Sequence, residues 1–171
     1  MRRNIKSLVI YFSRADENYF GGEMRYVDKG NTEVIAEHIK DITGADMFEI
    51  EPSIPYSRNY MECIEEAKVR TKTHNAPIKE SIKDISSYDV IYVGSPIYWG
   101  GMPEELFTAL SPLDFTGKTV RPFTTHEGSG LSSVPRQLES ICVGAKVLDG
   151  LAIVGSQVNG SKSIAEAWVN E

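Results

Sequence analysis

The chain has 171 residues, of which 41% are hydrophobic and 25% charged, and its formal net charge at pH 7 is −6. This length and composition predict a single globular domain over residues 1–171 with a full hydrophobic core. The acidic balance argues against nucleic-acid binding, which depends on Lys and Arg at phosphates. It is typical of an ordinary solvated surface, and it would also steer a basic protein partner.

Cysteine and hydropathy patterns limit the class of protein further. Cys63 and Cys142 are far apart and, with three scattered histidines, form no zinc-ligand spacing, so no metal site is expected. The basic start, Met1 to Lys6, precedes an apolar stretch that is too short for a signal peptide. No segment approaches the ~20 apolar residues of a membrane span. We therefore expect a cytoplasmic protein with buried, reduced thiols and no membrane association.

Strand and helix patterns alternate along the chain. Five runs have the pattern of a strand: residues 5–12, 46–50, 88–94, 119–125 and 147–154. Helix patterns alternate with them: residues 32–43, residues 57–72, a helix that starts near residue 103, one that includes residues 134–142, and one that includes residues 163–168. This alternation predicts an α/β fold whose parallel sheet is covered by helices on both faces.

Two of these segments carry more detailed expectations. Pro122 lies within the fourth strand and indicates a bulge or an early end of pairing, because proline cannot donate a ladder hydrogen bond. Ser163 and Glu166 have the spacing of a capping box at the start of the last helix. That helix is expected to bury Ile164 and Trp168.

Ligands of such sheets bind outside the carboxyl ends of the strands, and the first loop at that edge is interrupted. Ser13 and Arg14 end the first strand, and Asn31 and Thr32 open a helix whose free N–H groups and dipole favour a phosphate. Asn31 or Thr32 is equally typical of a simple N-cap. Residues 15–29 between the two halves show no periodicity, and they either close over the phosphate as a lid or extend into solvent.

Two further loops leave the same edge. Tyr98 and Trp99 follow the third strand just before Gly100, and such adjacent aromatic rings suit a flat aromatic ligand. One of the two rings is expected to pack under the next helix. The loop after the fourth strand, Thr125 to Gly130, offers hydroxyl and N–H donors to the polar edge of a ligand. It is also typical of a plain surface turn, in which His126 is solvated and is neither acid nor base.

These loops resemble those of the flavodoxin family. The likeness runs from the first strand to the last helix and rests on three segments: residues 13–14 with 30–33, residues 88–99, and residues 116–130. It implies a three-layer flavodoxin-like sandwich with a five-stranded parallel sheet in the order 2-1-3-4-5, and one non-covalently bound FMN. The candidate FMN-binding residues are Ser13, Arg14, Asn31, Thr32, Ser95, Pro96, Ile97, Tyr98, Trp99, Gly100, Thr125, His126, Gly128 and Ser129.

The resemblance also implies a function. The leading expectation is a low-potential electron carrier that passes electrons from a reductase to an acceptor protein, as a monomer or weak dimer. The alternative is an NAD(P)H-dependent quinone or flavin reductase on the same fold, and a third class is a cofactor-free binding module. Stacking on Tyr98 or Trp99 is expected to lower the potential of the flavin. A carbonyl of Gly100 or Gly101 is expected to accept a hydrogen bond from flavin N5.

Overall fold

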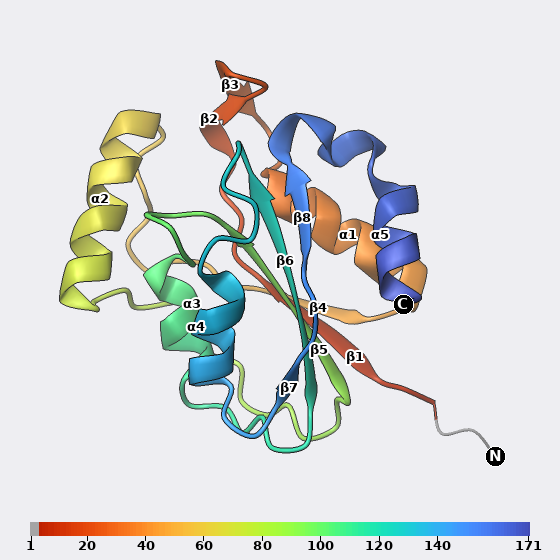
Figure 1. The fold of residues 1–171 in the computed structure, drawn as a ribbon. Helices are drawn as coiled ribbons and strands as arrows, with labels where there is room; N and C mark the ends of the chain where they lie inside the picture. The colour runs from red at the N-terminus through yellow and green to blue at the C-terminus, as the bar shows by residue number, and fades with distance from the viewer. Residues whose placement is uncertain (1–3) are drawn as a thin grey trace.

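The computed structural model describes residues 4–171, so residues 1–3, which include the basic Arg2 and Arg3, lie outside the part described here (Figure 1). Its central parallel sheet has six strands: β1 (Ser7–Tyr11), β4 (Asp46–Glu49), β5 (Val90–Pro96), β6 (Thr119–His126), β7 (Lys146–Val147) and β8 (Leu151–Val154). The order is β4-β1-β5-β6, with both β7 and β8 paired to β6. Counting β7 and β8 as one interrupted strand gives 2-1-3-4-5, which confirms the predicted fold.

Helices cover both faces of this sheet. They are α1 (Asn31–Thr43), α2 (Tyr60–Thr73), α3 (Glu104–Leu110), α4 (Val134–Ile141) and α5 (Lys162–Val169), with a 3₁₀ helix η1 (Gly155–Gly160). In Figure 1, α1 and α5 cover one face, α3 and α4 cover the other, and α2 lies outside α3. In the described part of the chain, no helix is long and apolar enough to cross a membrane.

The first strand shows why the sheet is buried on both sides. Leu8, Ile10 and Phe12 belong to the core under α3 and α4, whereas Val9 and Tyr11 belong to the core under α1 and α5. Successive side chains of a strand point to opposite faces. A strand that is apolar on both faces therefore needs a helical layer on each face.

The segment expected to lack regular structure forms a β-hairpin. Strands β2 (Asp16–Phe20) and β3 (Glu23–Val27) pair antiparallel in a separate two-stranded sheet. Gly21 and Gly22 connect them with φ of 67° and 86°, and positive φ at both central residues is what the favoured hairpin turn requires. The glycine pair is therefore the sequence signal for this hairpin. It was missed because the residues on either side show no periodicity.

The predicted fifth strand is interrupted. β7 and β8 both pair with β6, but residues 148–150 between them face only Arg121 and Pro122. Pro122 has no N–H to donate, so the ladder on this side of β6 cannot be continuous. On the other side Pro122 stays in register with Val93 of β5. The break in pairing expected at Pro122 therefore appears, but only toward the edge strand.

The last helix begins earlier than the predicted capping box. Ser161 is its N-cap, and the Ser161 hydroxyl donates a hydrogen bond to the Val158 carbonyl (2.7 Å) instead of capping the helix. The capping box at Ser163 is therefore wrong, because the helix start is set by packing after η1. Trp168 is buried as predicted, whereas Ile164 is 51% exposed and was wrongly assigned to the core.

Helix α2 is fastened to α3 by a buried ion pair. Arg70 of α2 donates to the Glu105 carboxylate (2.6 Å), which is fully buried in the first turn of α3. The Tyr56 hydroxyl donates to the other oxygen of Glu105 (2.9 Å), and Arg70 also donates to the Ile54 carbonyl (2.8 Å). Both carboxylate oxygens of Glu105 and both terminal nitrogens of Arg70 therefore have a partner, as burial of charge demands.

The carboxyl group of Glu49, at the end of β4, has a raised pKa. Burial, together with the smaller effects of the Glu33 and Glu51 charges, raises the pKa of Glu49 from its usual value of 4.5 to about 7, and Lys79 opposes this shift. The folded protein therefore holds a proton on Glu49 over a pH range in which the unfolded chain has released it.

Removing one member of the buried pair is expected to be costly. Arg70→Met should lower the free energy of unfolding by about 3–5 kcal/mol, because it leaves the Glu105 carboxylate buried without a cation. Adding Glu105→Gln should recover part of this loss. Urea denaturation measures both changes. The control is Lys29→Met, which breaks an exposed pair with Glu37 (2.8 Å) and should cost no more than about 1 kcal/mol. Equal losses at Arg70 and Lys29 would contradict the assignment.

Replacing Glu49 is expected to change the pH dependence of stability. Because the folded-state pKa is raised, the wild type loses stability relative to Glu49→Gln as pH rises from 4.5 through about 7. The variant should gain on the wild type across this window and keep that gain at higher pH. Urea midpoints at about pH 5 and pH 8 measure the difference. A pH profile of Glu49→Gln that runs parallel to that of the wild type would refute the shift.

Candidate functional site

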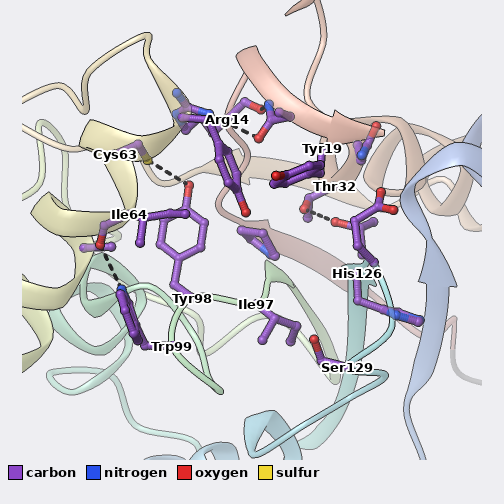
Figure 2. A pocket seen from close by; sticks show the side chains of 17 residues that line it. Arg14, Tyr19, Thr32, Cys63, Ile64, Ile97, Tyr98, Trp99, His126 and Ser129 are labelled. Carbon is purple, nitrogen blue, oxygen red and sulfur yellow. Dashed lines mark hydrogen bonds between the residues drawn. The ribbon is translucent and has the colours of Figure 1, made fainter. Parts of the chain in front are cut away.

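The three loops predicted to share one edge of the sheet surround a single cavity of about 360 Å³ (Figure 2). Ten of the residues expected from the sequence line it: Arg14, Asn31, Thr32, Pro96, Ile97, Tyr98, Trp99, Thr125, His126 and Ser129. They come from the ends of β1, β5 and β6 and from the start of α1. The remaining candidates, Ser13, Ser95, Gly100 and Gly128, are not part of the lining.

The interrupted first loop is closed in space. The Ser13 hydroxyl accepts a hydrogen bond from the backbone N–H of Glu33 in the first turn of α1 (3.1 Å). Gly30 packs so closely on the preceding turn that an added Cβ would lie 2.7 Å from the Arg14 carbonyl oxygen. Its lack of a side chain is what permits this approach. The two halves of the loop therefore meet, although fifteen residues (15–29) separate them.

The N-terminus of α1 faces the cavity with free donors. Gly30 is the N-cap and supplies no side-chain bond, so the alternative that Asn31 or Thr32 caps the helix is wrong. Within residues 4–171, the backbone N–H groups of Asn31 and Thr32 have no acceptor. Unpaired N–H groups at the positive end of a helix attract an anion. The Thr32 hydroxyl hydrogen-bonds the Thr125 hydroxyl (2.8 Å), which joins the first loop to the third.

The two aromatic residues of the second loop have different environments. The Tyr98 ring is partly buried, with its edge against Phe12 and Tyr56 at centroid distances of 5.7 Å. Burial raises the pKa of Tyr98 well above its usual value, so the hydroxyl stays neutral and accepts a contact from the Cys63 thiol (3.9 Å). The aromatic residue that packs inward is thus Tyr98, which packs against the core under α3 and α4 and also contacts Cys63 of α2.

Trp99 lies at the rim of the cavity. It is 53% exposed, it has a positive φ of 53°, and its indole N–H donates to the Ile64 carbonyl of α2 (2.8 Å). The Lys68 ammonium lies 5.3 Å from the centre of the ring. The indole plane is therefore held in one orientation by α2 instead of moving freely in solvent.

The backbone carbonyls expected to face a flavin are engaged elsewhere. The Gly100 carbonyl accepts hydrogen bonds from the Ser132 hydroxyl (2.7 Å) and from the Ser133 N–H (3.1 Å). The Gly101 carbonyl accepts one from the Tyr98 N–H (2.8 Å). The structure differs here from the expectation, because the loop closes on itself and docks on the segment before α4. Ser95 is fully buried, and its hydroxyl donates to the Pro96 carbonyl (2.5 Å).

Arg14 has a structural role that the sequence did not indicate. One terminal nitrogen of its guanidinium donates to the Glu17 carbonyl and to the Asn18 side chain, at 2.5 and 3.1 Å. The other donates to the carbonyls of Ser57 and Arg58, at 2.8 and 3.0 Å. These bonds tie the hairpin to the segment before α2. Of the guanidinium nitrogens of Arg14, only the buried Nε atom is without a partner in the described chain. The main role of Arg14 at the cavity is therefore to hold the hairpin against the segment before α2.

The third loop carries a local turn and an unexpected acid. The His126 Nδ1 atom accepts the N–H of Gly128 (2.9 Å), so this histidine orders its own loop. Glu127 also lines the cavity. Its carboxylate and the Asn31 amide both lie against Gly155 of η1, where an added Cβ would be 2.5 and 2.6 Å from them. A carboxylate therefore lies close to the start of α1.

Sequence reasoning missed two further walls of the cavity. The hairpin contributes Asn18 and Tyr19, and α2 contributes the last residues of the lining: Tyr60, Cys63, Ile64 and Ala67. The α2 residues share one face, at a spacing of three to four residues. This spacing is the sequence signal that could have identified α2 as a wall of the cavity. It is also the pattern of an ordinary helix that faces the core.

Comparison with known proteins agrees with this geometry. The family model described as flavodoxin matches residues 24–171. No protein of curated function matches the sequence. A candidate flavoprotein from Bacteroides uniformis is 24% identical, with a TM-score of 0.78 over 99% of this chain and 100% of the other. One from Bacteroides eggerthii is 25% identical, with a TM-score of 0.75 over 98% and 97%.

A third solved structure carries a ligand. A flavoprotein from Lactobacillus acidophilus, in complex with FMN, is 21% identical, with a TM-score of 0.63 over 91% of this chain and 97% of that chain. At this identity the likeness establishes the shared fold alone. The family model, however, covers most of the sequence and reaches from the hairpin to the last residue. The chain therefore belongs to the flavodoxin family.

Proposed function

We propose that this protein binds FMN in the cavity and carries electrons between a reductase and an acceptor protein in the cytoplasm. The observation that carries the proposal is the convergence of three loops on one cavity, with the Thr32–Thr125 hydrogen bond at their junction. Membership of the flavodoxin family supports FMN as the cofactor. So does the Lactobacillus acidophilus relative, which was solved with FMN.

The residues present fit a phosphorylated flat ligand. The free N–H groups of Asn31 and Thr32 offer donors to a phosphate without requiring a cation. Ile97, Tyr98 and Trp99 offer an apolar and aromatic wall to a planar ring. A ligand with both a phosphate and a planar ring, such as FMN, would contact both of these regions of the cavity at once.

The cofactor supplies the redox chemistry when it is bound, and the chain binds it, orients it and shields it from water. The net charge of −6 disfavours the gain of negative charge by a bound cofactor, although solvent and salt weaken the effect. It lowers the reduction potential, in keeping with a low-potential carrier.

The carrier role has a direct test against the reductase alternative. The purified protein should bind one FMN per chain and should oxidise NADPH negligibly, with or without a quinone. Adding a flavodoxin reductase should allow reduction of the bound flavin, as followed by its visible absorbance. Steady NADPH oxidation without a reductase would refute the carrier role in favour of the enzyme. A chain that takes up no FMN would refute FMN binding and leave a cofactor-free module.

Closure of the first loop should control FMN affinity. Gly30→Ala is expected to weaken FMN binding about tenfold or more, because the added methyl group forces the Ser13–Arg14 turn away from α1. Titration of FMN fluorescence measures the change. The control is Gly160→Ala, where an added Cβ meets no atom within 4 Å, and its affinity should equal that of the wild type. Wild-type affinity in Gly30→Ala would show that the phosphate does not depend on this closure.

A further inference from the structure

We propose that the β2–β3 hairpin is a wall of the cofactor site and that Tyr19 supplies an aromatic contact to the bound ligand. The inference rests on the proposed function, since it takes FMN as that ligand. It also gives the insertion in the first loop a role in binding. The hairpin fills the interruption in the first loop, and Tyr19 was not among the residues expected from the sequence.

Position is the first argument. The hairpin leaves the sheet at Ser13–Arg14 and returns at Gly30, the two points that lie against the start of α1. In Figure 1 it lies above the carboxyl edge of the sheet, between α2 and η1. Its turn approaches η1, since a Cβ at Gly21 would be 3.4 Å from the Ser156 side chain. The hairpin thus extends over the same edge of the sheet as the cavity.

Rigidity is the second argument. The Tyr60 N–H donates to the Glu17 carboxylate (3.0 Å), and the Glu17 N–H donates to the Arg58 carbonyl (3.3 Å). The rings of Tyr19 and Tyr60 meet edge to face, with centroids 4.9 Å apart and planes at 85°. Together with the four bonds of Arg14, these contacts fix the hairpin against α2. The Tyr19 ring is therefore already oriented, and binding has little side-chain entropy to remove.

Of the two hairpin residues that line the cavity, only one is free to meet a ligand. The Asn18 amide nitrogen donates to the carbonyls of Arg14 and Ala15, at 3.0 and 3.1 Å, and its oxygen accepts from Arg14. Tyr19 is itself part of the lining and remains 40% exposed. In the view of Figure 2 its ring lies on the Thr32 side of the cavity, and Ile97 lies on the opposite side. A ligand held at the start of α1 would cover an aromatic surface that otherwise faces water.

The hairpin also contains its own control. Tyr26 of β3 is 66% exposed and lies outside the lining of the cavity. It shares the residue type and the structural element with Tyr19. A substitution there tests any general effect of removing an aromatic ring from the hairpin.

The test compares FMN binding by the full-length wild type, Tyr19→Ala, Tyr19→Phe and Tyr26→Ala, with the dissociation constant and the quenching of FMN fluorescence as readouts. Tyr19→Ala should weaken binding about tenfold and leave bound FMN less quenched. Tyr19→Phe keeps the ring and should stay within about threefold of the wild type. Tyr26→Ala should bind FMN with the same affinity and quenching as the wild type. Circular dichroism confirms that each variant is folded.

Three outcomes would overturn the inference. Wild-type affinity and quenching in Tyr19→Ala would show that the ring does not touch FMN, while FMN binding itself would stand. Equal losses in Tyr19→Ala and Tyr26→Ala would show an effect on the hairpin as a whole and not a contact by Tyr19. A wild type that binds no FMN would remove the proposed function together with this inference.

Discussion

The close approach of Gly30 to the Ser13–Arg14 turn is the constraint on which the site depends. It brings the end of β1 to the start of α1, where Asn31 and Thr32 line the cavity and their N–H groups have no acceptor in the described chain. The fifteen inserted residues enter and leave at this single point. Because the cost of closing a loop rises slowly with its length, an insertion can be added here without moving the helix. The insertion changes the walls of the site and preserves its base.

Sheet topology brings the other two loops to this point. From β1 the chain goes to β4 on one side and then returns to β5 on the other, so the strand order reverses beside β1. Loops at such a reversal diverge and leave a crevice at the carboxyl edge. The Thr32–Thr125 hydrogen bond crosses this crevice at its base. It makes the first and third loops one surface, with the aromatic loop after β5 between them.

The main sheet and the shared position of the three loops were predictable, because strands buried on both faces leave continuous apolar runs and adjacent parallel strands end at one edge. The hairpin was not, since most of its residues are partly or fully exposed and show no alternation. The start of α5 depends on how Ser161 packs after η1, which no local pattern encodes. The uses of Arg14 and the Gly100 carbonyl likewise depend on partners distant in sequence, Ser57 and Ser132.

Those distant partners link the walls of the cavity to one another. Arg14 and Glu17 join the hairpin to the segment before α2, Trp99 joins α2 to the aromatic loop, and the Arg70–Glu105 pair holds α2 on α3. Helix α2 lies outside the two main cores and is fixed largely by these polar contacts. A ligand that contacts Tyr19 and the face of α2 therefore bridges elements joined by a few directional bonds. Its binding would stabilise the folded arrangement of the hairpin and α2 by mass action, so the stability of both walls is linked to occupancy of the site.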